Sequence, residues 1–319
     1  MKKLVAIVAG DPDSINTELI AKVWKKKSIF FNVNIFVVGN FGLIKKQFKN
    51  LKIKIKSQKI NELNNKNFKK KLLIFDVPFD SKKIFNISKK VKSEYVLKSL
   101  NIASNLAKQN KIAGFINCPI NKDEVFYNKN YGVTEFLAKK NNVLDSVSML
   151  IYNKELSVSP ITTHIKLKEV SAKINKKTIV DKLITINNFY IKKFKTKPKI
   201  GIIGLNPHNF ELRKNSEEKT LIIPAIKKLK KRGLNIKGPL PADTAFIDYK
   251  KKGFNVFVGM YHDQVLAPFK ALFKFNAINI TLGLPFIRIS PDHGTSRDII
   301  GKNKANPTSL IQSIKFFQK

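Results

Sequence analysis

Apolar runs about four to eight residues long alternate with longer polar segments of helical periodicity along most of the chain. Strands are predicted at residues 4–9, 33–38, 52–55, 72–77, 112–116, 199–205, 254–260 and 277–282. Helices are predicted at residues 15–24, 93–108, 133–140, 177–194, 217–232 and 307–317. Residues 146–151 and 156–162 favour an antiparallel pair. The alternation of strands and helices predicts an α/β protein with a mainly parallel sheet, and Asp13 or Ser14 is the expected N-cap of the first helix.

Residues 258–298 concentrate the side chains that can carry chemistry. This segment holds two of the four histidines, two of the four arginines and a dense run of glycines and prolines. The apolar run at residues 254–260 is followed directly by Tyr261, His262 and Asp263. Open α/β sheets bind ligands at the carboxyl ends of their strands, so we expect the functional site here.

The composition predicts a globular protein of about two domains, since the chain has 319 residues and 43% of them are hydrophobic. The formal charge of +39 would by itself suggest a nucleic-acid partner. Only four of the 61 basic residues are arginines, however, whereas proteins that bind phosphate backbones usually use the guanidinium fork. A basic nucleic-acid-binding protein is the rival hypothesis. It requires aromatic residues interleaved with lysine and arginine on one face, but the 24 phenylalanines fall mostly in apolar runs.

Cysteine usage and hydropathy indicate the compartment. The single cysteine, Cys118, excludes an internal disulfide and fits a reducing environment. The apolar run near the N-terminus is short and meets Asp11 and Asp13, which favours a core strand over a signal peptide. No run approaches the roughly 20 apolar residues of a membrane span. We therefore expect a cytoplasmic protein with no membrane partner and no specific nucleic acid.

Three of the four histidines, His164, His208 and His262, each come just after an apolar strand. Three neutral imidazoles form a divalent-metal site that keeps open coordination positions, as catalytic metals need. No short ligand pair supports this reading, and three unrelated loop histidines are the alternative.

Lys270, Asn279 and Arg288 would suit a small substrate that bears carboxylate and phosphate groups. Asp243, in the turn at residues 238–244, and Asp263, just after the apolar run at residues 254–260, are candidates for proton transfer. Neither a glycine-rich dinucleotide fingerprint nor a P-loop occurs in the chain, so any dinucleotide must be bound in another way.

The sequence resembles the 4-hydroxythreonine-4-phosphate dehydrogenase family of vitamin B6 (pyridoxine) biosynthesis, which includes relatives acting on 4-phosphorylated threonate or erythronate. The matching motifs cover roughly the C-terminal 60% of the chain, and residues 117–122 are the best match before them. The motifs are residues 134–138, 163–164, 205–208, 238–244, 261–264, 279–288 and 292–295.

The resemblance implies a three-layer α/β/α fold like that of isocitrate and isopropylmalate dehydrogenases, with two domains and a cleft between them. One domain would comprise residues 1–127 and 265–319 and carry the nucleotide loop, and the other would comprise residues 128–264 and carry most metal ligands and the dimer contact. A homodimer is expected, with the active site at the domain and subunit boundary.

The resemblance also implies the site residues. It assigns one divalent ion per subunit, zinc, cobalt or magnesium, to His164, His208 and His262. It assigns substrate binding to Thr134, Lys270, Asn279 and Arg288. The segment His293-Gly294-Thr295 resembles a nucleotide loop and is assigned to NAD or NADP.

The expected activity is the oxidation of 4-phosphooxy-L-threonine to 2-amino-3-oxo-4-phosphooxybutanoate, which loses carbon dioxide to give 3-amino-2-oxopropyl phosphate. The metal would act as Lewis acid on the substrate hydroxyl, and NAD or NADP would accept hydride. Dehydrogenation of 4-phospho-D-threonate or 4-phospho-D-erythronate, and an inactive relative, are the alternatives.

Several positions depart from the pattern of this family. Val133 stands where the family has a histidine, and Val265 stands where it has a glycine. The first loop, residues 10–16, and the segment at residues 209–213 have lost glycines. Each lost glycine restricts how closely backbone can approach a ligand, which leaves the substrate less certain than the fold.

Overall fold

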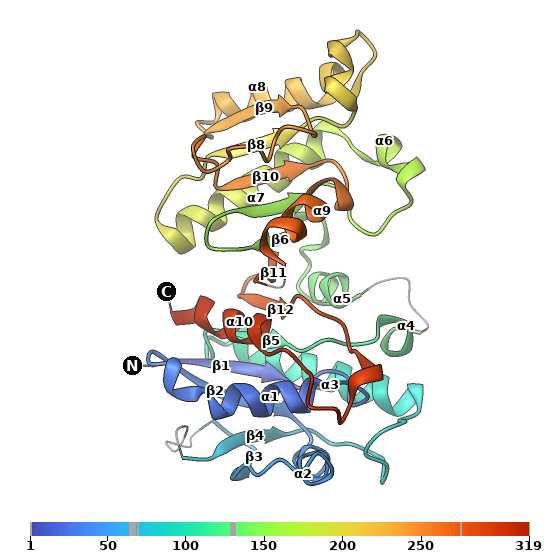
Figure 1. The fold of residues 1–319 in the computed structure, drawn as a ribbon, viewed down its shortest axis with the longest axis vertical. Coiled ribbons are helices and arrows are strands. Elements are labelled where there is room, and N and C mark those ends of the chain that lie inside the picture. The colour runs from blue at the N-terminus through green and yellow to red at the C-terminus, as the bar shows by residue number, and fades with distance from the viewer. Residues whose placement is uncertain (1, 64–67, 69, 128–131, 275, 319) are drawn as a thin grey trace. The chain divides into compact units, whose positions relative to one another are not determined.

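The computed structural model describes residues 2–63, 68, 70–127, 132–274 and 276–318. The chain forms two compact units, the first made of Met1–Asn142 with Leu284–Lys319 and the second of Val143–Gly283 (Figure 1). The sequence predicted boundaries after residues 127 and 264, whereas the two units divide after Asn142 and after Gly283. Helix α5 (Val133–Lys140) lies in the first unit because its buried Val133 and Leu137 belong to that unit's core.

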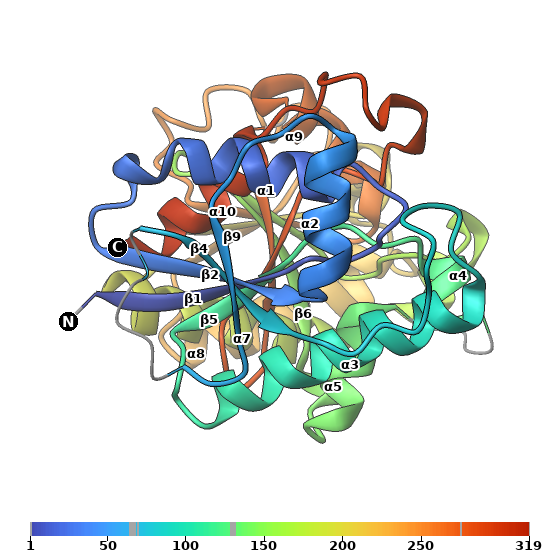
Figure 2. The same cartoon turned by 90° about the horizontal axis from the view of Figure 1, so that it is seen from below.

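The first unit is a parallel sheet with helices on both faces. Its strands follow the order β3-β4-β2-β1-β5-β12, and each described pairing among them is parallel. Figure 2 shows α1, α2 and α10 on one face of this sheet and α3 on the other. The strands are β1 (Lys3–Val8), β2 (Val33–Gly39), β3 (Ser57–Ile60), β4 (Leu72–Asp76), β5 (Gly114–Asn117) and β12 (Arg288–Pro291). The remaining elements are α1 (Asn16–Lys25), η1 (Lys27–Ile29), α2 (Phe41–Asn50), α3 (Lys89–Lys108), α4 (Lys122–Val125), η6 (Arg297–Ile299) and α10 (Thr308–Gln318).

The second unit is a mixed sheet in the order β11-β6-β7-β10-β8-β9. Strand β6 is antiparallel to both β7 and β11, whereas β7, β10, β8 and β9 run parallel. The strands are β6 (Ser148–Tyr152), β7 (Ser157–Pro160), β8 (Ile200–Ile203), β9 (Ile236–Leu240), β10 (Val256–Gly259) and β11 (Ile278–Leu282). The helical elements are η2 (Leu144–Ser146), η3 (Leu167–Glu169), α6 (Val170–Lys173), α7 (Lys176–Phe194), η4 (Pro207–Leu212), η5 (Glu218–Ile222), α8 (Ile223–Lys231) and α9 (His262–Phe273).

The predicted α/β class is confirmed, and the hydrophobic runs explain why. Strands β1, β2, β5 and β10 bury most or all of their side chains, as strands covered on both faces must. The predicted antiparallel pair is β6 and β7. No helix among the residues that the structure describes is long and apolar enough to cross a bilayer.

Three local predictions are corrected. Residues 52–55 are not a strand, since Lys52 adopts a left-handed φ of 54°, and the strand follows at Ser57–Ile60. The helix predicted from residue 217 begins as a π-helical turn before Pro224, whose missing N–H cannot join a regular ladder. Neither Asp13 nor Ser14 caps the first helix, which begins at Asn16 after an uncapped Ile15.

Candidate functional site

Three histidines follow three neighbouring parallel strands of the second unit. Strand β10 pairs in parallel with β7 on one side and β8 on the other, so the three carboxyl ends lie at one edge of the sheet. His164 follows β7, His208 lies on η4 after β8, and His262 begins α9 after β10. The ring centroids of His164 and His262 are 5.5 Å apart. The predicted strand-end placement of these side chains is therefore observed.

The carboxylate of Asp263 orients the ring of His262. Nδ1 of His262 lies 2.7 Å from Oδ1 of Asp263, and because a carboxylate only accepts, Nδ1 is the donor. This leaves Nε2 as the ring nitrogen with a lone pair. A histidine held through one nitrogen by a carboxylate is the usual form of a metal ligand, so the donor chemistry fits a divalent ion.

The structure places two of the three predicted ligands, His164 and His262, side by side. His208 is exposed and has a left-handed φ of 50°. Within the described ranges, no group of three or more histidine, cysteine or acidic side chains has a geometry that could hold a metal ion. The contribution of His208 to this site stays a prediction.

Two side chains that the sequence analysis did not single out, Gln264 and Glu218, hold the loops that carry these histidines. The side chain of Gln264 accepts from the backbone N–H of Met260 at 2.7 Å and donates to the carbonyl oxygen of Gly204 at 2.6 Å. The fully buried Glu218 accepts from the backbone N–H groups of Leu205 and Asn206 at 2.7 and 2.8 Å. The loops after β8 and β10 are thus tied to one another and to η5. The only sequence signal was their place within or just after two motifs.

Arg288 and Thr134 lie together in the first unit, although 154 positions separate them. Nη1 of Arg288 donates to the hydroxyl of Thr134 at 3.4 Å, and Nε donates to the side-chain oxygen of Asn117. Arg288 is only 4% exposed, and this burial lowers the pKa of its guanidinium to about 10, with Glu135 opposing the shift. The side chain still carries its charge at neutral pH.

The other two predicted substrate contacts belong to the second unit. Lys270 lies on α9 and is half-buried, and burial lowers the pKa of its amine. Asn279 lies on β11, opposite Ile151 of β6. Each is held by regular secondary structure, which gives a substrate contact a fixed direction.

The segment His293-Gly294-Thr295 follows β12 at the edge where β1 and β5 also end. The Thr295 carbonyl accepts from the backbone N–H of Ile15 at 3.1 Å. Nε2 of His293 is buried without a hydrogen-bond partner, and burial lowers the pKa of the ring. A Cβ on Gly294 would meet no atom within 4 Å. An orphaned ring nitrogen beside open backbone fits a segment that receives a ligand such as a nicotinamide nucleotide.

An ionic cluster, formed by the buried Asp11, Asp13 and Lys92 with the partly buried Glu124 and the exposed Arg297, lies beside this segment. The side chain of Lys92 is 1% exposed, and its amine lies 2.7 Å from Asp13 and 3.6 Å from Asp11 and also contacts Glu124. Arg297 binds the two oxygens of Glu124 at 2.7 and 2.6 Å, which is the main cause that lowers the pKa of Glu124 to about 2. The cluster joins the segments after β1, β5 and β12. Sequence reasoning missed it, because Lys92 is one of many lysines on helices.

Polar side chains occupy the first loop, where the family pattern has glycines. Asp13, Ser14 and Asn16 are buried, and each makes a hydrogen bond or ion pair within the protein. Asn16 donates to the carbonyls of Ala9 and Pro119 at 2.9 and 2.8 Å. Gly10 is retained where the chain has a φ of 74° and a Cβ would lie 2.7 Å from the carbonyl of Cys118.

The two valines that depart from the family pattern are core residues. Val133 is 4% exposed and packs in the core of the first unit, and Val265 is fully buried in the core of the second. Both side chains therefore contribute packing. Asp243 is exposed, and its carboxylate lies 3.5 Å from the hydroxyl of Thr244, so it is accessible for proton transfer. Asp263 instead holds His262, which favours an orienting role over that of a base.

Comparisons with known proteins identify the family of the chain. Residues 32–317 match the family described as "Pyridoxal phosphate biosynthetic protein PdxA". A 4-hydroxythreonine-4-phosphate dehydrogenase from Sulfurihydrogenibium sp. is 37% identical over 98% of this chain and 96% of that protein. A relative from Oceanobacillus iheyensis, provisionally named D-threonate 4-phosphate dehydrogenase, is 34% identical over 98% of this chain and 96% of its own. The crystal structure of a 4-hydroxythreonine-4-phosphate dehydrogenase from Klebsiella pneumoniae superimposes with a TM-score of 0.89 and 28% identity, covering 100% of this chain and 99% of that one.

Proposed function

The chain belongs to the family of the pyridoxal phosphate biosynthetic protein PdxA, and from this premise we propose that it is a dehydrogenase of 4-phosphooxy-L-threonine. The product of oxidation is 2-amino-3-oxo-4-phosphooxybutanoate. As a 3-oxo acid it loses carbon dioxide and gives 3-amino-2-oxopropyl phosphate. The enzyme is an oxidoreductase that acts on a CH–OH group and uses a nicotinamide cofactor.

One observation supports the site assignment most strongly: His164 and His262 lie 5.5 Å apart, ring to ring, at the carboxyl edge formed by β7, β10 and β8. We infer that these two side chains and His208 hold one zinc, cobalt or magnesium ion. Asp263 supports this role for His262, since its carboxylate keeps the proton on Nδ1 and leaves Nε2 for the metal.

A bound divalent ion supplies Lewis acidity at the substrate hydroxyl, and the nicotinamide supplies the hydride acceptor. The chain's own residues bind and orient the substrate. Arg288 presents a permanent positive charge in a desolvated position, where an anionic group of the substrate is its natural ligand. Thr134 keeps the guanidinium in place through its hydroxyl. Lys270 adds a second cation, and Asn279 adds an amide that can both donate and accept.

Proton balance requires one acceptor for the hydroxyl proton. Oxidation removes a hydride from the carbinol carbon and a proton from its oxygen, and Asp243 is the proposed acceptor because it is exposed and free of an ion pair in the described structure. After carbon dioxide leaves, the carbon that bore the carboxylate takes up a proton.

The cofactor site and the assembly are further parts of the proposal. We assign His293, Gly294 and Thr295 to NAD, with NADP as the alternative, on the strength of the orphaned nitrogen of His293 and the open space at Gly294. A homodimer with the site at the subunit boundary is proposed from the family alone. The alternative substrates are 4-phospho-D-threonate and 4-phospho-D-erythronate, and the first is favoured by the name of the Oceanobacillus relative.

The test is a spectrophotometric assay of reduced nicotinamide. Purified protein is incubated with zinc, cobalt or magnesium, with NAD or NADP, and with each of the three phosphorylated substrates. Turnover with 4-phosphooxy-L-threonine that exceeds turnover with the other two by at least about tenfold in kcat/KM supports the proposal. If 4-phospho-D-threonate or 4-phospho-D-erythronate is turned over more efficiently, that compound is the substrate instead. No turnover with any of the three would indicate an inactive relative.

A further inference from the structure

A cavity of about 320 Å³ opens at the amino ends of strands β1 and β2 in the first unit. It lies at the edge where β1 begins at Lys3 and β2 begins at Val33. The loops that carry the ionic cluster and the His293 segment follow the other ends of the strands. Since β1 has six residues, about 20 Å of strand separates the two edges. The cavity is thus distinct from the nucleotide segment of the same unit.

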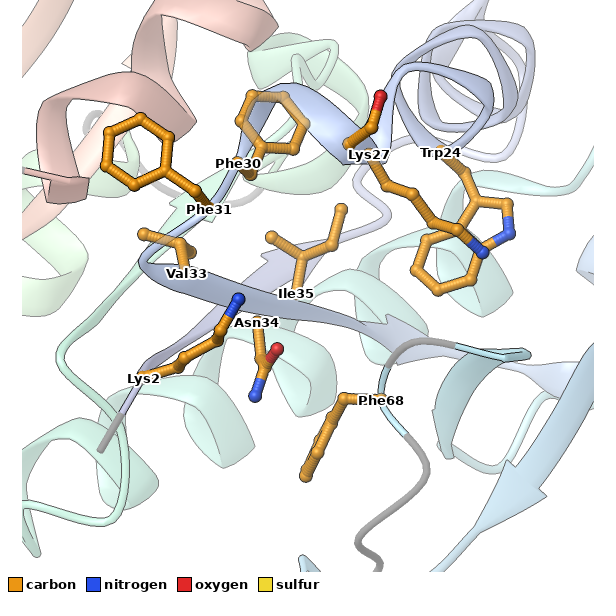
Figure 3. A pocket seen from close by; sticks show the side chains of 10 residues that line it. Lys2, Trp24, Lys27, Phe30, Phe31, Val33, Asn34, Ile35 and Phe68 are labelled. Atoms are coloured by element: carbon orange, nitrogen blue, oxygen red, sulfur yellow. The ribbon is translucent and has the colours of Figure 1, made fainter.

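Four of the ten residues that line the cavity are aromatic. Figure 3 shows Phe30 and Phe31 on one side of the hollow, Trp24 on another and Phe68 on a third. Trp24 and Phe30 are buried, at 6% and 3% exposure, and form fixed walls. Phe31 is 64% exposed, more than the other exposed aromatic side chain of the described residues, Tyr127 at 46%. An exposed phenylalanine at the rim of an apolar hollow is typical of a ligand site, because a ligand would remove its ring from water.

Two amines give the cavity a single sign of charge. Nζ of Lys27 lies 4.2 Å from the centroid of the Trp24 ring, and the amine of Lys2 points toward the hollow (Figure 3). Of the described residues that line it, none is acidic. Two ammonium groups beside low-dielectric aromatic walls attract an anion more strongly than the same groups would in open solvent.

We propose that this cavity binds a small amphiphile that has an aromatic body of one or two rings and one anionic group, a carboxylate or a sulfonate. The rings stack among Trp24, Phe30 and Phe31, and the anion lies between Lys2 and Lys27. The volume is sufficient for a bicyclic body, since small-molecule sites begin at about 300 Å³. The phosphorylated hydroxy acid of the active site is excluded, because it has no apolar body to cover the aromatic walls.

The chain has a single tryptophan, Trp24, so its fluorescence reports directly on this cavity. The probe is anilinonaphthalene sulfonate, titrated into the full-length protein with excitation of tryptophan. Saturable energy transfer from Trp24 to one probe per chain is the expected result. Because this probe binds many proteins, bound probe that takes no energy from Trp24 would overturn the proposal.

Two variants and a matched control locate the binding. Phe31→Asp places a carboxylate at the exposed rim and is expected to weaken energy-transfer binding at least about tenfold, whereas Ile191→Asp adds the same group at an exposed apolar position on α7 and should change nothing. Lys27→Gln leaves the walls intact and is expected to weaken binding about threefold or more at low salt, with less effect at high salt. Equal binding by Phe31→Asp and Ile191→Asp would overturn the site.

A separate experiment, which uses only the unmodified protein, tests whether the ligand must carry an anionic group. Naphthalene sulfonate and naphthalene methanol share the ring system and differ in the anion, and each is measured by quenching of Trp24. The sulfonate is expected to bind at least about fivefold more tightly. Equal affinities for the two compounds would show that the cavity does not select an anionic group, and would overturn the proposed ligand.

Discussion

Asn117 accepts a hydrogen bond from Nε of Arg288, and both side chains are buried in the first unit. The two residues lie on adjacent parallel strands, with Arg288 paired to Phe115 in the register of β5 and β12. The bond fixes the plane of the guanidinium, since Nε is the donor nearest to the aliphatic stem. The proposed substrate arginine is therefore oriented by the strand beside it.

The change Arg288→Lys keeps the charge and removes the planar fork. We expect kcat/KM for 4-phosphooxy-L-threonine to fall, because a lysine cannot replace the paired N–H donors. The fall should correspond to a loss of about 1 to 3 kcal/mol in the free energy of transition-state binding. Steady-state kinetics measure this, with NAD affinity and thermal unfolding as controls. Unchanged efficiency, or a loss of stability that accounts for the whole effect, would remove Arg288 from the substrate site.

Asn117 is expected to act through Arg288. The change Asn117→Ala should raise KM about tenfold, since the guanidinium loses the acceptor that orients it. In a chain that already carries Arg288→Lys, the same change should have less than half of this effect, because lysine has no Nε–H to be oriented. Equal effects in the two backgrounds would show that Asn117 acts independently of Arg288.

The carboxylate of Asp263 is expected to tune metal affinity. The change Asp263→Asn should weaken zinc or cobalt binding about ten- to a hundredfold, because the amide is a weaker acceptor for the Nδ1 proton of His262. Isothermal titration calorimetry with the metal alone measures this. Asp181→Asn, at a partly exposed acid on α7, is the matched control. Equal affinities of the two variants would contradict the metal assignment of His262.

The ionic cluster is expected to make stability pH-dependent through Glu124. Hydrogen bonds from Arg297, followed by those from Lys92, lower the pKa of this carboxyl from its ordinary 4.5 to about 2. A depressed pKa stabilises the fold above the unfolded value, and this contribution is lost as pH falls from about 4.5 to about 2.

The variant Glu124→Gln should therefore be less stable than the parent by about 1 to 3 kcal/mol at pH 7, and the difference should narrow as the pH approaches 2. Urea unfolding at several pH values measures both chains. Asp248→Asn, an exposed acid in the second unit, should show no such trend. A difference that stays constant with pH would argue against an ionised Glu124 in this cluster.

Val133 is expected to be required for packing. Restoring histidine, as Val133→His, places an imidazole in the core of the first unit and should reduce the free energy of unfolding by about 2 kcal/mol. Val133→Ile is the apolar control, and its free energy of unfolding, measured with urea, should fall by less. A stable histidine variant with improved kcat/KM would instead show that this position can face the substrate.

The sequence by itself determined the elements and the residue types of the site. Buried strands need continuous apolar runs, so β1, β2, β4, β8, β10 and β11 could be read from the chain, as could the polar side chains at their ends. His164, His208 and His262 were predictable because each is the first ionisable side chain after such a run or close to it. Local periodicity carries this information, and it needs no partner from elsewhere in the chain.

Only the tertiary structure decided which distant residues meet and which lysines are buried. Arg288 contacts Asn117 across 171 positions, and no local pattern encodes that pairing. Lys92 and the exposed lysines of α3 look alike in sequence, yet only packing of the helix against the loops after β1 and β5 places the Lys92 amine among three carboxylates. Register between strands and burial against other elements are properties of the folded chain, because both depend on contacts between segments that are far apart along it.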